Sequence, residues 1–372
     1  MWSANLFQVT TGNIGPRLNF ESVSWTIELN GTESISMKLR KSDLPQVNLK
    51  QWLAPWWAGV VLFWNDTPIV AGPIITNPNE TFDTISLGCA GIRAVLAKRL
   101  VTREQSNWAN LAKDVIQYKG LSLGTIAKRV VTQGQMKKGG ALPISFPIAD
   151  ETVVDDADHQ RTYRGFNVQN ISVDDVLTKL SNVINGPDIM FKPRLIRDNQ
   201  LTFDMWHGTE KQPRIYQKQT PTWDTTPVAG QVTDMALVTT GTYMTNRTYS
   251  LGAGQDESLL IKVNTNEAPL MNQAPLLETV INVGNSENAT LVNTYGISNL
   301  WSNKEPLSEI QMTIRGDGII PFGQFWPGDL IHVVTKGWIN LPDGVNQMRL
   351  LSLSGDSSNE VKVSLQKEDK FT

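Results

Sequence analysis

The chain has 372 residues, and its 33 Lys and Arg against 36 Asp and Glu give a formal net charge of -3 at pH 7. Charged residues make up 19% of the chain, against about 25% in an average soluble protein, while 40% are hydrophobic and 12 are Trp. This composition excludes a charge-rich disordered chain and a protein that holds nucleic acid by bulk positive charge. Because a solvated surface usually carries more charge, we expect part of this one to face other protein.

Cys89 is the single cysteine, so no intrachain disulfide can form, which fits either folding in a reducing cytoplasm or a fold that needs no disulfides. The first 20 residues lack the basic and apolar regions of a signal peptide. The most apolar window, 54–64, is shorter than the roughly 20 residues of a membrane helix. We therefore expect no membrane span.

The first hundred residues show the two-residue period of strands. Apolar side chains alternate over 23–29 and 35–39 around Asn30-Gly31, which predicts a hairpin. A second hairpin is predicted from 60–64 and 69–72, which flank Asn65-Asp66-Thr67-Pro68. A strand near 81–89 and a short helix over 92–100 complete this part.

The periodicity of the sequence changes between residues 105 and 222. An apolar face at helical spacing predicts a helix over 106–119, and 121–165 have no clear period and indicate loops with short strands. A second helix is predicted over 172–185, with Ser172 as N-cap and an apolar stripe that includes Ile184. A hairpin of 188–194 and 201–206 with a turn near Asp198-Asn199 follows, and the Pro-rich segment 207–230 is the expected linker.

Strands return after the linker and continue to the end. They are expected over 233–238, 243–251, 259–263, 309–314, 329–334, 347–352 and 360–365, with a helix inserted at about 286–301. The predicted fold is a β-dominated α+β class. We expect three domains: a first β-barrel-like domain over 1–104, a helix-bearing α+β domain over 105–222, and a second β-barrel-like domain over 223–372.

A search for catalytic, metal and cofactor motifs finds none. His159, His207 and His332 are far apart, with no HExxH pair and no G-x-S-x-G elbow. GQMKKGG at 134–140 has glycines at P-loop spacing, but Gly140 stands where the motif needs Lys, and the start of a dinucleotide fingerprint at 252–254 lacks its third glycine. The acidic run Asp150, Glu151, Asp155, Asp156 and Asp158 does not match calcium-loop spacing, so a solvated loop is favoured. We expect no cofactor and no catalytic residue.

Aromatic side chains gather in two places. Trp52, Trp56, Trp57, Phe63 and Trp64 fall within 13 residues, and Phe322, Phe325 and Trp326 precede the turn Pro327-Gly328-Asp329. Exposed coplanar rings could bind carbohydrate, but packing in a β core or a subunit contact is favoured. The candidate interface residues are Trp56, Trp57, Trp64, Phe325 and Trp326.

The order of these patterns resembles the tail-hub proteins of long-tailed bacteriophages, which are also described as minor tail proteins or baseplate hubs. The matching segments include SVSWTIELNGTESISMKL, VVLFWNDTPIVAGPI, AGIRAVLAKRLV, SVDDVLTKLSNVINGPDIMFKP, LTFDMWHG, TDMALVTTGTYMTNRTYSLGAG, WPGDLIHVV and MRLLSLSGDSSNEVKVSLQ. None of them is catalytic, so the resemblance depends on their order over nearly the whole chain.

This resemblance implies a structural protein of a siphovirus virion, assembled in the host cytoplasm and located at the tail tip. Such hubs form a homotrimer whose two barrel-like domains per subunit make a pseudo-sixfold ring under the hexameric tail tube. The implied partners are the distal tail or tail-tube protein, the tape-measure protein and downstream tip or receptor-binding proteins, with no sequence-specific nucleic acid. Because the chain stops at Thr372, directly after the last strand, we expect no appended lytic domain.

Two other functions stay open. The Trp-rich segment could serve a carbohydrate- or receptor-binding tip module. A glycan hydrolase could use a pair of carboxylates that meet only in three dimensions, although no pattern points to a specific pair.

Overall fold

The computed structural model describes residues 1–76, 80–156, 158–183, 185–197, 199–215, 220–227, 230–284 and 286–367. Strands outnumber helices among these residues. The main sheet is antiparallel apart from the short strand β13 (Thr222–Asp224), which confirms the β-dominated α+β class. The chain divides into two compact units, one of residues 1–235 with 311–372 and one of residues 236–310. The three-domain division of the sequence stays a prediction.

The N-terminal part of the large unit is a run of antiparallel strands, and both predicted hairpins are confirmed. β3 pairs with β4 so that Trp25 lies opposite Ile35. β5 pairs with β6 through a turn in which Asn65 and Asp66 have φ values of 46° and 65°, left-handed angles that Asn and Asp tolerate. The strands are β1 (Trp2–Gln8), β2 (Ile14–Leu18), β3 (Phe20–Glu28), β4 (Ser34–Arg40), β5 (Ala58–Trp64), β6 (Thr67–Thr76) and β7 (Thr84–Ala90).

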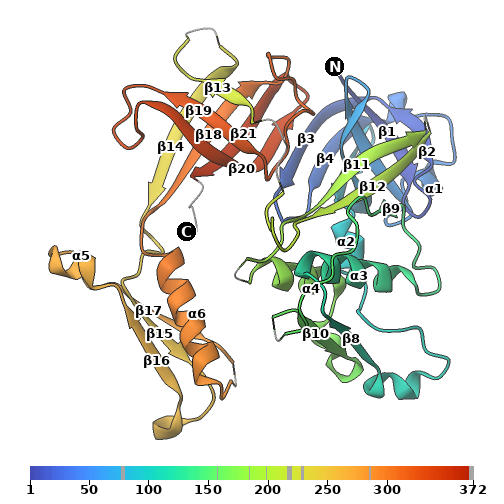
Figure 1. Cartoon of the computed structure of the whole chain (residues 1–372). Coiled ribbons are helices and arrows are strands. Elements are labelled where there is room, and N and C mark those ends of the chain that lie inside the picture. The colour runs from blue at the N-terminus through green and yellow to red at the C-terminus, as the bar shows by residue number, and fades with distance from the viewer. Residues whose placement is uncertain are drawn as a thin grey trace. The chain divides into compact units, whose positions relative to one another are not determined.

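The C-terminal strands join the same sheet instead of forming a separate one. β20 pairs with β3, and the main path runs β14-β18-β21-β20-β3-β4-β7-β6-β5-β1-β2. The described strands close no barrel, so the expected barrel-like form of the two β-rich portions is wrong, because the β3–β20 pairing joins them into one sheet. The red and orange strands therefore adjoin the blue ones at β3 in Figure 1. The added strands are β13 (Thr222–Asp224), β14 (Val232–Thr240), β18 (Leu307–Arg315), β19 (Leu330–Thr335), β20 (Gly344–Asp356) and β21 (Glu360–Lys367). β13, inside the expected linker, pairs with β19.

The predicted helix over 106–119 is wrong. Residues Trp108–Lys113 form a single 3-10 segment, η2, and Val115–Lys119 form strand β8, which pairs with β10 (Gln160–Arg164). Ile116 is buried while Val115 and Gln117 are exposed, which is the alternation of a strand. The apolar residues that suggested one helical face are thus divided between two elements.

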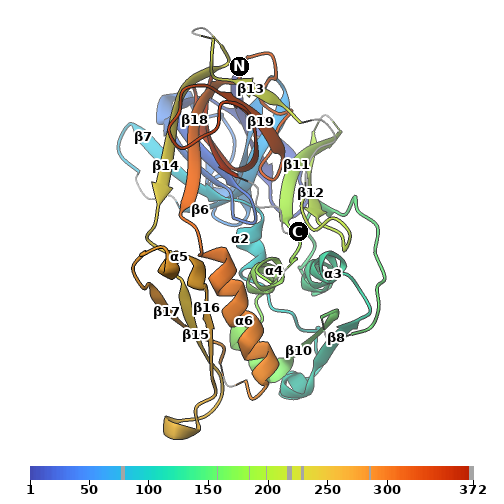
Figure 2. The ribbon, with the colours of Figure 1, turned by 60° about the vertical axis from the view of Figure 1, so that its left-hand side comes forward.

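A helix that the sequence pattern did not predict occupies part of the expected loop region. α3 (Leu123–Gln135) begins at Ser122, whose hydroxyl accepts a hydrogen bond from the Thr125 amide at 3.3 Å, and it buries Ile126 and Val130. It packs beside α4 (Val173–Ser181), as Figure 2 shows. Gly124 weakened the helical sequence pattern, because glycine disfavours helices. A glycine is needed at this position, since a Cβ would lie 2.1 Å from the Gly208 carbonyl oxygen.

The second predicted helix is confirmed as α4, with Ser172 as its cap. Its apolar stripe is buried, and the Ile184 end of the prediction lies outside the described residues. The 188–206 hairpin is confirmed as β11 (Ile189–Arg197) and β12 (Gln200–His207), with Asp198 also outside the described residues. Remaining short elements of the large unit are η1 (Lys41–Asp43), α1 (Leu49–Trp52), α2 (Arg93–Leu96), β9 (Ile144–Ser145) and η3 (Gly165–Asn170).

The small unit consists of a three-stranded sheet with one long helix, α6, against one face (Figure 1). α6 (Ala289–Ser302) confirms the predicted inserted helix, and the predicted strands are present as β15 (Arg247–Leu251) and β16 (Ile261–Thr265). The third strand, β17 (Glu278–Asn282), was not predicted. Short segments η4 (Asp256–Ser258) and α5 (Glu267–Met271) complete the unit.

Within the described part of the chain, no helix combines the length and apolar character that a membrane crossing requires.

The cap of α4 gives a direct test of the local fold. The Ser172 hydroxyl accepts a hydrogen bond from the Asp175 amide at 3.1 Å. We expect Ser172→Ala to lower the free energy of unfolding by about 1 kcal/mol, measured by urea denaturation, because that amide loses its partner. Ser172→Asp should retain most of the stability, and equal losses in both variants would contradict the capping role.

Candidate functional site

An extended aromatic cluster is built from both ends of the sequence. Trp25 stacks on Phe322 with ring centroids 5.1 Å apart and an interplanar angle of 18°. Trp2 lies 5.3 Å from Trp25, and Phe322 lies 5.8 Å from Phe325. The cluster also includes Trp64 and Trp223, and all six rings are buried. Two of the candidate interface residues, Trp64 and Phe325, therefore contribute to the chain's own core.

The other three candidates differ from one another. Trp56 is 40% exposed and has a φ of 65°, a left-handed backbone angle that is uncommon for a bulky residue. Trp57 is half-buried and meets Trp52 edge to face at 5.3 Å. Trp326 is half-buried beside Lys192. The structure thus does not bring the five candidates together, and their role in an interface stays a prediction.

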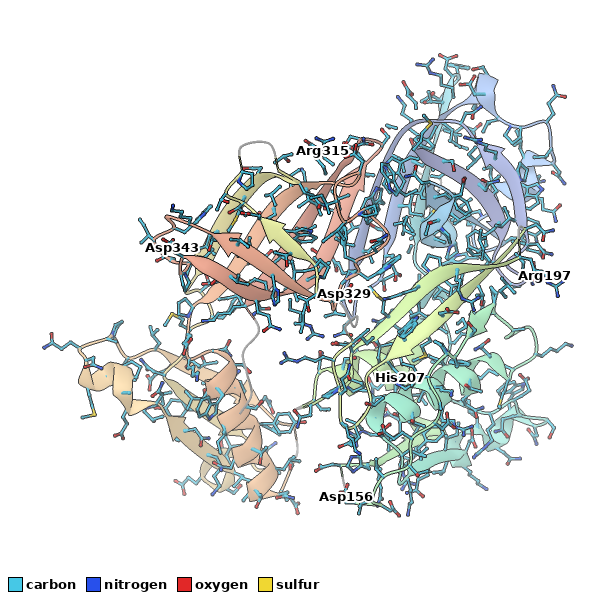
Figure 3. All side chains as sticks on the ribbon, turned by 45° about the horizontal axis from the view of Figure 1, so that its top comes forward. Asp156, Arg197, His207, Arg315, Asp329 and Asp343 are labelled. Atoms are coloured by element: carbon cyan, nitrogen blue, oxygen red, sulfur yellow. The ribbon has the colours of Figure 1, made fainter. Side chains whose placement is uncertain are left out.

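Lys192 lies between two indole rings, an arrangement that the sequence pattern did not indicate. Its ammonium is 5.4 Å from the Trp206 ring centroid and 5.3 Å from that of Trp326. Burial lowers the pKa of Lys192, an effect that the nearby carboxylate of Asp329 opposes. These cation–π contacts tie the β11–β12 hairpin to the loop that leads into β19, in which Asp329 is labelled in Figure 3.

A buried polar network surrounds the turn after β3. The Arg93 Nε donates to Asp174 Oδ1 at 2.6 Å, and one of its terminal nitrogens donates to the Asn30 carbonyl. The Asn30 side chain accepts from the Ile189 amide at 2.7 Å and donates to Asp188. Asp188 in turn pairs with Arg349 of β20. The network joins strands from both β-rich portions to the helices.

Glu33 is the most perturbed acid of this region. It is buried, and its Oε2 has no hydrogen-bond partner among the described residues. Burial raises the pKa of Glu33 to about 7, although the positive charge of Arg93 acts in the opposite direction. A Cβ at Gly91 would lie 1.8 Å from the same carboxyl oxygen, so a side chain there would displace the Glu33 carboxyl.

The raised pKa of Glu33 makes stability depend on pH. Between about pH 4.5 and 7 the folded chain holds a proton that the unfolded chain has lost, so this group's contribution to stability falls as pH rises through that window. We expect Glu33→Gln to remove this slope and to raise the free energy of unfolding at pH 8 by on the order of 2–3 kcal/mol, with little change at pH 4.5. Urea denaturation at both pH values measures it. Glu28→Gln, at an exposed carboxylate of β3, is the matched control; an unchanged slope in Glu33→Gln would contradict the assignment.

Two of the histidines noted in the sequence, His159 and His207, have structural partners. His159 lies between two carboxylates, 2.7 Å from Asp156 and 3.1 Å from Glu210, and these hydrogen bonds outweigh burial and raise its pKa. His207, labelled in Figure 3 at the end of β12, is buried, and its Nδ1 is 2.8 Å from the Gly208 carbonyl oxygen. In the described ranges no three His, Cys, Asp or Glu side chains lie where they could hold a metal ion.

The other candidate motifs also have packing roles. Asp150 of the acidic run forms an ion pair with Lys128 at 2.7 Å. In the glycine-rich segment 134–140, the Lys137 ammonium donates to the Leu100 carbonyl at 2.6 Å. Cys89 is buried, and burial raises its pKa to about 12, so it is an inert thiol.

Comparison with known proteins identifies the fold. No family model matches the chain, and no curated protein matches its sequence. Among solved structures, the match to a tail protein from Neisseria meningitidis MC58 spans 99% of this chain and 97% of the Neisseria chain, with a TM-score of 0.57 and 14% identity. The 43 kDa tail protein of prophage MuSo2 from Shewanella oneidensis covers 98% of both chains, with a TM-score of 0.60 and 11% identity. The prophage tail protein gp18 from Listeria monocytogenes EGD-e covers 99% of this chain and 95% of its own, with a TM-score of 0.50 and 8% identity. The predicted resemblance is therefore confirmed at the level of the fold, which is that of phage tail proteins.

Proposed function

We propose that this chain is a structural protein of a bacteriophage tail and forms a homotrimeric hub at its tip. The observation that carries the proposal is the likeness to solved tail proteins over 98–99% of the chain, with most of their own lengths also covered. An obligate assembly also accounts for the low charge of the chain, because surface committed to other subunits needs fewer charged side chains.

In this role the two β-rich portions of each copy contribute to a ring, and three copies give a pseudo-sixfold match to a hexameric tube. The ring closes the distal end of the tube until infection. It contacts the distal tail or tail-tube protein and the tape-measure protein on one side and anchors tip or receptor-binding proteins on the other. We assign it no catalytic activity, because its buried ionic groups are used in packing.

The oligomeric state tests this proposal. We expect native mass spectrometry at micromolar concentration to give three times the 41.3 kDa of one chain, and we expect the chain to be present in purified virions. A monomer that is also absent from virions would exclude the hub.

A carbohydrate- or receptor-binding tip module is the second candidate, and Trp56 is the observation that favours it. This ring is exposed and is held by a left-handed backbone. If the module exists, Trp56→Ala should abolish binding on a glycan array of host cell-wall fragments while circular dichroism stays unchanged, because a stacking ring contributes most of such a contact. Trp57→Phe serves as the neighbouring control, and absence of binding by the unmodified chain would remove this candidate.

A further inference from the structure

The middle row of one face of the small unit's sheet is apolar, and no layer covers that face among the described residues of 236–310. Thr248 and Ser250 of β15 are buried toward α6, and the Thr248 hydroxyl donates to the Asn299 side chain of that helix. Strand alternation places Tyr249 on the opposite face, where its register partners are Val263 and Val280. Val263 is 50% exposed and Val280 is 63% exposed. A contiguous apolar row thus crosses all three strands on the face away from α6.

The helix of the small unit is apolar on more than its packed side. Val292, Gly296 and Leu300 are buried, but Leu291, Tyr295, Ile297 and Trp301 are exposed. A helix that is apolar around its circumference is normally buried on most sides. Close to half of the exposed large apolar side chains among the described residues belong to this unit, which holds one fifth of the chain. Surface of this kind marks a protein contact.

The small unit is also acidic. Residues 236–310 contain seven Asp and Glu against three Lys and Arg. Glu257 and Glu267 are exposed and lie just before and just after β16, so they flank the apolar face in the sequence. A partner surface that fits this face must therefore be apolar with positive charge around it.

The large unit carries a surface with those properties. On the outer face of the β8–β10 ribbon, Val115 lies opposite Arg164 in register, and Lys119 is exposed on the same face two positions beyond Gln117. The adjoining segments η2 and η3 expose Trp108 (54%) and Phe166 (68%). Lys113 is exposed at the end of η2. We call this set the ribbon surface: Trp108, Lys113, Val115, Lys119, Arg164 and Phe166.

The surroundings of the ribbon surface are basic. Residues 93–170, which include both strands of the ribbon with η2 and η3, contain twelve Lys and Arg against seven Asp and Glu, although the whole chain has a net charge of -3. Three of these acids already have partners: Asp114 pairs with Arg103, Asp150 with Lys128 and Asp156 with His159. The positive charges of Lys113, Lys119 and Arg164 are thus not balanced by acids of the ribbon itself.

We propose that the apolar sheet face of the small unit in one copy docks on the ribbon surface of the next copy. The proposal rests on the hub function proposed above and assigns the ring contact. Both surfaces belong to the same chain. Each copy therefore contacts one neighbour through its small unit and the other neighbour through its ribbon surface. Such head-to-tail contacts generate a closed ring when the rotation between copies closes. Opposite charge selects this pairing, since two small-unit faces repel each other and so do two ribbon surfaces.

A charge exchange tests the contact in the full chain. Lys113→Glu with Lys119→Glu should weaken the trimer, raising its dissociation constant at least about tenfold, because acids then face acids. Glu257→Lys with Glu267→Lys should weaken it similarly. The quadruple variant should recover a trimer, as measured by analytical ultracentrifugation at low salt. Lys50→Glu with Lys336→Glu, at exposed lysines outside both surfaces, is the matched control.

Each outcome of this experiment decides between the two proposals. If neither double variant weakens the trimer, the contact is overturned but the hub proposal stands. The same holds if the quadruple variant is folded by circular dichroism but does not recover the trimer. A wild-type chain that stays monomeric overturns the hub and the contact together.

A disulfide cross-link separates a contact between copies from one within a copy. Two differently tagged chains, one carrying Val263→Cys and the other Val115→Cys, are co-expressed and oxidised; the native Cys89 is buried and inert. We expect the mixed cross-linked dimer to exceed either like-with-like dimer at least about tenfold, because only unlike surfaces meet. Equal yields of the three dimers, or none, overturn the contact.

Discussion

The antiparallel pairing of β3 with β20 is the constraint on which the large unit depends. It places Trp25 opposite Gly355, residues from the two ends of the sequence. A side chain at Gly355 would not fit, because its Cβ would lie 2.7 Å from the Trp25 ring. The indole nitrogen of Trp25 donates to the Asp356 carbonyl at 3.3 Å, and that of Trp2 donates to the Ser358 carbonyl at 2.9 Å. The pairing thus brings N-terminal tryptophans against the C-terminal strands, and the aromatic core forms where they meet.

The buried polar network around the β3–β4 turn has a complementary effect. Apolar packing is not directional, whereas the hydrogen bonds of Arg93, Asn30 and Asp188 require particular positions of α2, the β3–β4 turn and the start of β11. Leaving one member unpaired in this environment costs several kcal/mol, so the network favours one arrangement of the elements over alternatives. Glu33 lies at its edge with one oxygen unsatisfied, which explains why that carboxyl favours its neutral form.

Local patterns predicted much of the fold, and long-range contacts account for what they missed. The Asn30-Gly31 turn and the Ser172 cap act within a few residues, so their hairpin and helix were correctly predicted. α3 has a Ser122 cap and an apolar stripe of the same kind, but Gly124 and Gly134 inside it weakened the helical pattern. The reason for Gly124 is a close carbonyl from far along the chain, which the local sequence does not reveal. The same limit applies to the aromatics: Trp56 and Trp64 have similar sequence surroundings, but only Trp64 is reached by rings from the opposite end of the chain. Lys192 gives no sequence signal for the same reason, since its two indole partners come from separate segments.

The position of the small unit in the sequence has a consequence for how such chains can diversify. It is inserted between β14 and β18, which are neighbours in the large sheet. The chain therefore leaves and re-enters the sheet at adjacent strands. The hydrogen bonds between β14 and β18 do not depend on the structure of the residues between them. Segments of different length and composition can occupy this position without altering the register of the other strands.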